Sequence, residues 1–255
     1  QGFDQYANVR PARVLRGITG PLRNGDAIDW VIIRENSEGE YSGSGGRVHR
    51  GLPEELATET SVFTRNGVTR IHRFAFELAR QRPRKHLTLV TKSNAQRHGM
   101  VMWDEIFYEA AKSYPDVETQ RVLVDAVTTQ MVLKPRSLDT IVATNLHADI
   151  LSDLAAALSG SLGIAPTANL NPERKFPSMF EPIHGSAFDI AGKGIANPIA
   201  TFWTASMMLE HLGERDAAAR LMKAIETVTA KRVHTPDLGG EATTAIVTEA
   251  VCESL

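Results

Sequence analysis

Residues 140–153 read TIVATNLHADILSD, an apolar and β-branched run that passes directly into a stretch with two aspartates. The first four residues are typical of a buried strand, and the polar residues after them mark the end of such a strand. Short apolar runs and longer amphipathic stretches alternate in the same way in both directions along the chain. This alternation predicts an α/β fold, with a central sheet flanked by helices.

Three other apolar runs predict further buried strands, at residues 30–33, 87–90 and 122–124. Apolar side chains at helical spacing predict a helix over residues 68–79, which should end before Pro83 because proline cannot donate to the preceding turn. Other helices are expected at residues 102–112, 198–212 and 216–231. The stretch over residues 43–53, Gly-rich at its start, predicts a projecting loop or hairpin.

The composition is that of an ordinary globular protein, with 42% hydrophobic and 23% charged residues in a chain of 255. The 28 Lys and Arg against 30 Asp and Glu leave a net charge of -2, which argues against nucleic acid or a membrane surface as the partner. The basic run at residues 80–86 is better explained as cations at the end of a helix. No apolar run approaches the roughly 18 residues of a membrane span. Cys252 is the single cysteine, so an internal disulfide is impossible and a reducing, cytoplasmic location is expected.

Polar side chains follow all four predicted strands. They are Arg34, Lys92, Asp125 and Asn145. Ligands of α/β proteins gather at the carboxyl ends of strands, so a guanidinium, an amine, an acid and an amide there predict one shared pocket. The alternative is that these are four solvated loop residues.

Asp149 and Asp153 lie four residues apart at the start of a predicted helix. This spacing puts both carboxylates on one helix face, where they repel each other unless a cation compensates. Oxygen ligands without a second cysteine favour Mg²⁺ or Mn²⁺, and Asp125 is a candidate third ligand. The alternative is that Asp149 only favours the helix dipole while Asp153 faces solvent.

Residues 181–192 combine small and acidic side chains, and Asn197 follows where another helix would begin. Small residues let backbone amides approach a ligand, and an acidic side chain can accept the ribose hydroxyls of NAD. The stretch lacks the GxGxxG spacing, so an ordinary surface loop is the alternative.

Five segments together resemble the β-decarboxylating 2-hydroxyacid dehydrogenases, the family of isopropylmalate, isocitrate, tartrate and D-malate dehydrogenases. They are residues 6–12, 33–41, 91–94, 145–153 and 181–198, and the resemblance covers essentially the whole chain. The resemblance implies the two-domain α/β fold of isopropylmalate dehydrogenase. Residues 1–160 would form the central substrate, metal and dimerisation domain, and residues 161–255 the C-terminal part of the nucleotide-side domain.

The resemblance further implies that the chain is N-terminally incomplete. In the family, the first strands of the nucleotide-side domain and another substrate-binding arginine lie upstream of the position of Gln1. The start of the chain at Gln1 is therefore expected to be a cut end, and an inactive fragment remains one of the alternatives.

The resemblance also assigns chemistry to single residues. Arg10 and Arg34 correspond to the guanidiniums that grip the substrate carboxylates, a task that suits the forked geometry of arginine. Lys92 corresponds to the group that takes the proton of the substrate hydroxyl, and Tyr41 to the acid that protonates the enol after CO₂ leaves.

Metal and partner roles follow from the same resemblance. Asp149 and Asp153 correspond to ligands of Mg²⁺ or Mn²⁺, joined by Asp125 from the second subunit of a homodimer. Lys92 would also serve the partner's site, so that each active site is shared between two subunits.

Cofactor binding is implied for the region after residue 180. The corresponding positions are Glu181, His184, Gly185, Ser186, Ala187, Asp189 and Asn197. Asp189 would repel a 2′-phosphate, so NAD is favoured over NADP.

The implied reaction is the NAD-dependent oxidation and β-decarboxylation of a small 2-hydroxy dicarboxylic acid. Residues 82–85 and 166–172 are similar to the tartrate and D-malate branch, so D-malate or tartrate is the favoured substrate. The alternatives are a 3-isopropylmalate dehydrogenase, a non-catalytic dimerisation or regulatory subunit of the same fold, and a metal-dependent phosphate-handling enzyme. His147 with Ala148 replaces the usual aromatic-glycine pair, and Phe188 replaces a proline beside Asp189, but neither change removes a reacting group.

Overall fold

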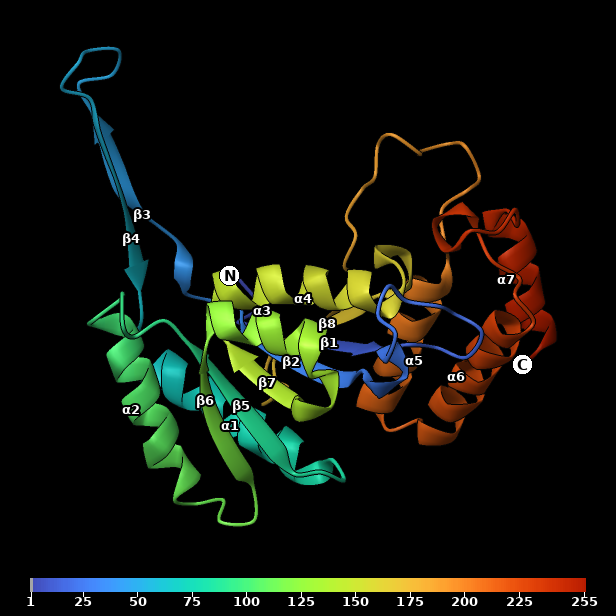
Figure 1. Ribbon diagram of the computed structural model, residues 1–255, viewed down its shortest axis with the longest axis horizontal. Coiled ribbons are helices and arrows are strands. Elements are labelled where there is room, and N and C mark those ends of the chain that lie inside the picture. Colours follow the sequence, from blue (N-terminus) through green and yellow to red (C-terminus); the bar gives the residue numbers. More distant parts are fainter. Residues whose placement is uncertain (1) are drawn as a thin grey trace.

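The computed structural model describes residues 2–255, and Gln1, the expected cut end, lies outside the described residues. Over those residues the strands form a large mixed sheet and a separate hairpin (Figure 1). The large sheet contains β1 (Ala7–Arg13), β2 (Asp29–Glu35), β5 (His86–Thr91), β6 (Glu118–Leu123), β7 (Thr140–Ala143), β8 (Pro166–Leu170) and β9 (Met179–Pro182). The hairpin contains β3 (Gly39–Val48) and β4 (Leu56–Val62).

Helices cover both faces of the sheet, and further helices pack at one end of it, as the α/β prediction requires. The α-helices are α1 (Arg65–Gln81), α2 (Gly99–Ala111), α3 (Val124–Leu133), α4 (Asn145–Ser159), α5 (Ile199–Leu212), α6 (Arg215–Ala230) and α7 (Thr244–Glu253). Short 3₁₀ turns lie at Gly25–Ala27, Pro135–Ser137, Leu162–Ile164 and Pro236–Leu238. The predicted helices correspond to α1, α2, α4, α5 and α6, and α1 ends before Pro83 as expected.

The strand order β6-β5-β7-β2-β1-β8-β9 places the predicted strands next to one another. The pairs β6·β5, β5·β7 and β7·β2 are parallel, whereas β1 runs antiparallel to both β2 and β8. Parallel pairing brings the carboxyl ends of β2, β5, β6 and β7 to one edge of the sheet. That edge is the one at which the sequence predicted a pocket.

The prediction for residues 122–124 needs a correction. Strand β6 ends at Leu123, and Val124 begins α3 instead of continuing the strand. Because β6 is the outermost strand of the sheet, none of its six residues is buried.

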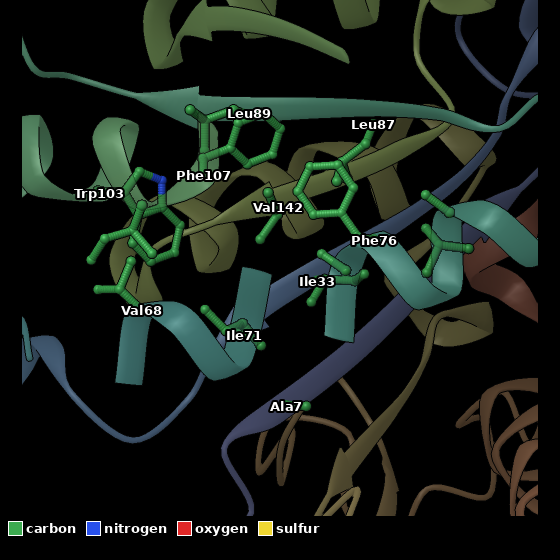
Figure 2. Close-up of a cluster of buried hydrophobic side chains, with 14 of the residues drawn as sticks. Ala7, Ile33, Val68, Ile71, Phe76, Leu87, Leu89, Trp103, Phe107 and Val142 are labelled. Carbon is green, nitrogen blue, oxygen red and sulfur yellow. The ribbon is translucent and has the colours of Figure 1, made fainter. Parts of the chain in front are cut away.

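Two apolar layers lie on opposite faces of this sheet. Helices α1 and α2 cover one face, where Phe76, Trp103 and Phe107 pack against Leu87 and Leu89 of β5 (Figure 2). Helices α3 and α4 cover the other face over Trp30, Ile32 and Ile141. A helix packed on each face leaves only the edges of the parallel strands open to ligands.

Strands β8 and β9 extend the sheet beyond β1, and α5, α6 and α7 pack at that end. The proposed boundary between residues 160 and 161 falls just after α4, at Gly160, the residue that caps this helix. The sheet continues across this point because β8 pairs with Ala7–Val9 of β1. The division into two domains stays a prediction.

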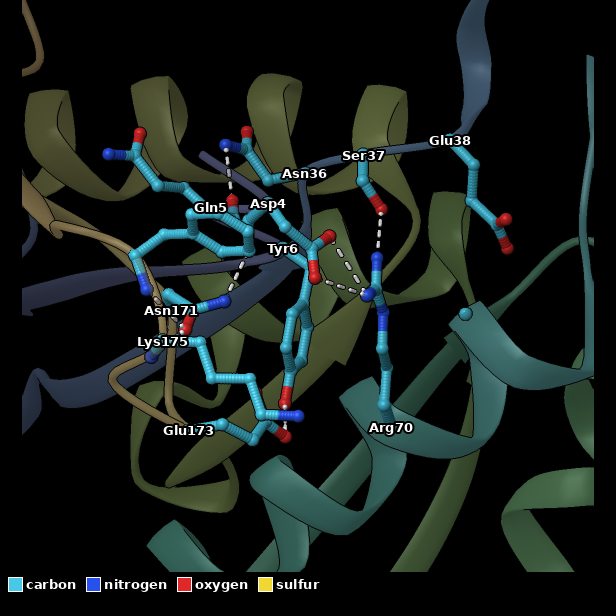
Figure 3. Close-up of polar contacts among 12 residues, drawn as sticks. Asp4, Gln5, Tyr6, Asn36, Ser37, Glu38, Arg70, Asn171, Glu173 and Lys175 are labelled. Carbon is cyan, nitrogen blue, oxygen red and sulfur yellow. Dashed lines mark hydrogen bonds and ion pairs between the residues drawn. The ribbon is translucent and has the colours of Figure 1, made fainter. Parts of the chain in front are cut away.

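A polar network fastens the start of the chain to α1 and to the turn after β8 (Figure 3). Arg70 of α1 donates to both carboxylate oxygens of Asp4, at 2.9 and 3.0 Å, and to Ser37 Oγ at 2.8 Å. The Tyr6 hydroxyl donates to Glu173 Oε1 at 2.8 Å, and the Arg70 guanidinium lies 4.0 Å over the Tyr6 ring. The segment between β2 and the hairpin is therefore held in place at Ser37.

The hairpin of β3 and β4 projects away from the body of the protein, which confirms the prediction for the Gly-rich stretch (Figure 1). All seven residues of β4 are exposed, as is most of β3. Over residues 2–255, the structure contains no helix with both the length and the apolar character needed to cross a bilayer.

Candidate active site

Two arginines of adjacent strands point toward the same helix. Asn8 of β1 lies opposite Arg34 of β2, and Arg10 lies opposite Ile32. Directly opposed residues of an antiparallel pair share one face of the sheet, so Arg10 and Arg34 emerge together. This is the face that α4 covers, and α4 supplies Asp149 to them.

Asp149 is the point where the site converges. Its Oδ1 accepts from Arg10 Nη1 at 3.2 Å and also from Arg34 Nη1. The Tyr41 hydroxyl, at the base of the hairpin, donates to the other oxygen, Oδ2, at 3.1 Å. The structure thus brings together four of the predicted residues, and the fifth, Asp153, lies one helical turn beyond Asp149.

The electrostatics of this group follow from burial and mutual charge. The pKa of Arg10 is lowered by burial and by the charge of Arg34. The pKa of Asp153 is raised by burial and by the charge of Asp149, which is the repulsion that their spacing predicted. The pKa of Tyr41 is raised by burial and by Asp149, so its hydroxyl keeps its proton at neutral pH.

Both guanidiniums are held by further side chains. Arg34 Nε donates to Asn145 Oδ1 at 2.9 Å. Arg10 Nε donates to Asn8 Oδ1 at 2.7 Å, and Arg10 Nη1 donates to Ser152 Oγ at 2.5 Å. Sequence reasoning found Asn145 but missed Asn8 and Ser152. The signal for Asn8 was its position two residues before Arg10, which puts both on one face of a strand.

The hairpin base is tied to α4 by Glu40, another residue that the sequence prediction missed. Its carboxylate accepts from Thr144 Oγ1 at 2.8 Å and from the Leu146 backbone N–H at 3.2 Å. A carboxylate on the first backbone amides of a helix satisfies donors that have no partner within the helix. Tyr41 is therefore presented by a strand whose preceding residue is anchored on the helix that carries Asp149.

A second group lies at the ends of β5 and β6. Lys92 Nζ is 2.5 Å from Asp125 Oδ1, and this contact lowers the pKa of Asp125. Asp125 stands in the first turn of α3 and its side chain is well exposed. Within residues 2–255, no three His, Cys, Asp or Glu side chains lie together in a way that could hold a metal ion, so Asp125 does not join Asp149 and Asp153 in one chain.

The region assigned to the cofactor borders an open cavity of about 830 Å³. Of the predicted residues, the cavity is lined by His184, Ser186, Ala187 and Asn197. Glu181 lies in β9 and accepts from Asn169 at 3.0 Å, while Asp189 is exposed on the following loop. Gly185 has a φ of 66°, a left-handed conformation that glycine adopts without strain.

Residues 1–255 match the family model described as isocitrate/isopropylmalate dehydrogenase. The chain belongs to this family. A probable tartrate dehydrogenase/decarboxylase from Agrobacterium vitis is 74% identical over 258 residues, which cover all of this chain and 72% of the relative. The decarboxylating D-malate dehydrogenase of Escherichia coli is 51% identical, over 98% of this chain and 72% of its own length.

A solved structure gives the same assignment for the fold. The crystal structure of isocitrate dehydrogenase from Methylococcus capsulatus superposes with a TM-score of 0.92 at 44% identity, covering all of this chain and 74% of that one. The resemblance read from the sequence is therefore confirmed, including the tartrate and D-malate branch. The chain is that of a decarboxylating dehydrogenase of the isocitrate/isopropylmalate dehydrogenase family.

The two departures from the family pattern have different surroundings. His147 is buried at the start of α4, where burial lowers its pKa, and its Nδ1 has no hydrogen-bond partner in the described part of the chain. Phe188 is 87% exposed, between Ala187 and Ile190, which line the open cavity. Neither residue interrupts the contacts among Arg10, Arg34, Tyr41 and Asp149.

Proposed function

We propose that this protein oxidises and decarboxylates a small 2-hydroxy dicarboxylic acid, D-malate or tartrate, with NAD and either Mg²⁺ or Mn²⁺. The observation that carries the proposal is the convergence of Arg10, Arg34 and Tyr41 on the Asp149 carboxylate. Two guanidiniums beside two carboxylates suit an anionic substrate that is bound partly through a cation. The names of the relatives from Agrobacterium vitis and Escherichia coli support the choice of acid.

The donor set fits a divalent cation. Asp149 and Asp153 share one face of α4, and burial together with the charge of Asp149 raises the pKa of Asp153. A hard cation compensates two neighbouring carboxylates and accepts oxygen ligands from substrate and water. When bound, such an ion would act as a Lewis acid on the substrate oxygens.

The residues of the chain would then divide the remaining work. Arg10 and Arg34, which hold Asp149 here, would turn to the substrate carboxylates and fix their orientation. Lys92 would take the proton of the substrate hydroxyl, and Tyr41 would return a proton to carbon after CO₂ leaves. The Tyr41 hydroxyl supports this role by its position, because it donates to the Asp149 carboxylate on which the two arginines also converge.

The cofactor is proposed to lie in the cavity bordered by His184, Ser186 and Asn197. Its volume of about 830 Å³ is within the usual range for ligand sites. Asp189 would accept the ribose hydroxyls, which is the basis for preferring NAD to NADP. The chemistry that NAD would supply when bound there is an acceptor for the hydride of the substrate.

We also propose a homodimer in which each subunit contributes Lys92 and Asp125 to the site of the other. The amine and the carboxylate contact each other, and within the described residues Asp125 forms no cluster with Asp149 and Asp153 that could hold a metal ion. Exposed apolar side chains on α3 and α4 support a partner on this side, among them Leu133 at 68% and Ile150 at 55% exposure.

The proposal is tested by following the formation of NADH or NADPH with D-malate, tartrate and 3-isopropylmalate, each with NAD or NADP and with Mg²⁺, with Mn²⁺ or with a chelator and no added metal. Production of the keto acid and of CO₂ is measured in the same samples. We expect turnover with D-malate or tartrate, with NAD, and only in the presence of a divalent cation. If no acid reduces either cofactor, the proposed reaction is wrong; a preference for 3-isopropylmalate would replace the substrate.

A further inference from the structure

A buried carboxylate on α2, that of Asp104, contacts the residue that follows Lys92 and takes no part in the contacts of Asp149. Asp104 belongs to α2, on the helix face that also buries Met100, Trp103 and Phe107. It is only 8% exposed. A carboxylate buried on an apolar helix face is costly unless charged or hydrogen-bonding partners compensate it.

The partners of Asp104 come from the segment that follows β5 and from β6, next to Lys92 and just before Asp125. Asp104 Oδ2 accepts from Ser93 Oγ at 2.7 Å and from Arg121 Nη1 at 2.8 Å. Arg121 Nη1 also donates to Ser93 Oγ at 3.2 Å. Ser93 directly follows Lys92 after β5, and Arg121 lies in β6, four residues before Asp125.

The register of β5 and β6 shows where these contacts lie relative to Lys92 and Asp125. Thr91 of β5 lies opposite Leu123 of β6 in the parallel ladder. Lys92 is one residue beyond that rung on one strand, and Asp125 is two residues beyond it on the other. Arg121 pairs with Leu89 inside the ladder, so Asp104 joins Ser93, which lies beyond the end of β5, to a residue of β6 whose place the ladder fixes.

We propose that Asp104 and Arg121 are positioning residues that act through Ser93 and hold Lys92 at a fixed distance from Asp125. This inference rests on the proposed function, in which the amine and the carboxylate are presented together to one site. A proton acceptor that is displaced by about 1 Å can lose up to about a hundredfold in rate, so such a clamp affects chemistry more than binding.

The test compares Ser93→Ala, Asp104→Asn and Arg121→Gln with the unaltered protein, with Arg121→Lys as the conservative variant. A matched control is Arg65→Gln, which breaks the pair between Arg65 and Glu109 that links α1 to α2 at the same 2.8 Å distance. Two quantities are measured in each protein. The first is kcat and KM for the hydroxy acid, and the second is the rate at which an amine-reactive anhydride labels Lys92, read by mass spectrometry relative to Lys85.

Lys85 is the internal reference because it is paired with Asp116 at 3.1 Å, away from the clamp. We expect the three variants to lower kcat about tenfold while KM changes less than about twofold. Lys92 should label faster relative to Lys85, because its ion pair with Asp125 is weakened. Arg121→Lys should recover part of both effects, and Arg65→Gln should show neither.

Two results would overturn the proposal. One is an unchanged labelling ratio of Lys92 in all three variants. The other is a loss of kcat that Arg65→Gln shows as well, or one that the smaller fraction of folded protein, measured by thermal unfolding, fully explains. If the unaltered protein oxidises no hydroxy acid, the proposed function fails, while the labelling comparison still decides whether the clamp holds Lys92.

Discussion

At the scale of single residues, Arg10, one of the two arginines that contact Asp149, differs from Arg13, the other arginine of β1. Arg10 contacts Asp149, Asn8 and Ser152, whereas Arg13 pairs with Glu226 at 2.7 Å and lies 5.4 Å from the centre of the Trp203 ring. Both belong to β1. Because both arginines lie in one strand, a substitution of Arg13 is a matched control for the same substitution of Arg10.

Arg10→Lys should lower kcat/KM for the hydroxy acid about 10- to 100-fold, because an ammonium group cannot grip a carboxylate through two parallel bonds. Arg13→Lys should change kcat/KM by less than about twofold. Steady-state kinetics of both variants, with melting temperatures alongside, would check this. Equal losses in the two variants would mean that Arg10 acts on the fold and not on the substrate.

Tyr41 offers a second test at this scale. Tyr41→Phe removes a hydroxyl whose neighbours are Asp149 and solvent, since the side chain is 53% exposed, so stability should hardly change. Loss of a general acid should reduce kcat by about 10² to 10⁴. The comparison is Tyr108→Phe, a similarly exposed tyrosine on α2, which should keep full activity. Wild-type kcat in Tyr41→Phe would remove this residue from the mechanism.

At the scale of elements, the packing of α1 on α2 encloses an ionisable side chain. His72 of α1 is completely buried, 4.3 Å from the ring of Trp103, and neither of its ring nitrogens has a hydrogen-bond partner in the described residues. Burial lowers the pKa of His72 from 6.5 to about 3. The interface between these helices therefore requires the neutral imidazole.

This burial predicts a pH dependence of stability. Between pH 3 and 6.5 the unfolded chain binds a proton at His72 that the folded chain does not, so the free energy of unfolding falls as the pH falls. The slope contributed by one group is at most about 1.4 kcal/mol per pH unit. His72→Leu should flatten the pH profile in urea titrations, whereas His49→Asn in the exposed hairpin should leave it unchanged. An unaltered slope in His72→Leu would show that other groups set the acid sensitivity.

Elements also show how far the sequence could be read and where it failed. Long or strongly apolar segments such as α1 and β7 carry their own periodicity and were predicted. Strand β1 was missed because it contains Pro11, which is tolerated since β8 pairs only with Ala7–Val9, leaving one side of β1 unpaired around Pro11. The short strands β8 and β9 gain their stability from pairing with distant parts of the chain, which no local pattern records.

The site shows the same division. Residues at strand ends and on one helix face, such as Arg34, Lys92 and Asp149, follow from topology and spacing. Glu40 joins segments far apart in the sequence, and Asp104 reaches from α2 to β6 and to the segment after β5, so only the folded chain reveals these contacts. Asn8 lies two residues from Arg10, but on a strand that was not predicted. Roles of single groups came from the family resemblance and not from spacing.

At the scale of the whole molecule, the separation of Lys92 and Asp125 from Asp149 decides how subunits would cooperate. In the proposed homodimer, a subunit with Lys92→Ala spoils its partner's site, and a subunit with Asp149→Asn spoils its own. Each homodimer of a single variant would then be inactive. A mixed dimer would contain one intact site, because the Asp149→Asn subunit supplies Lys92 to the unaltered Asp149 of its partner.

Mixing equal amounts of the two variants, after subunit exchange, should therefore restore up to about a quarter of the wild-type activity, since half of the dimers are mixed and each has one working site. The control mixes Lys92→Ala with Asp125→Asn. Those two groups are contributed by the same subunit to its partner, so every site in a mixed dimer would lack one of them and no activity should return. NADH formation before and after exchange measures both mixtures. Recovery in neither mixture would indicate that each site is built within one subunit. Recovery in both would indicate that the Lys92 and the Asp125 of one site come from different subunits.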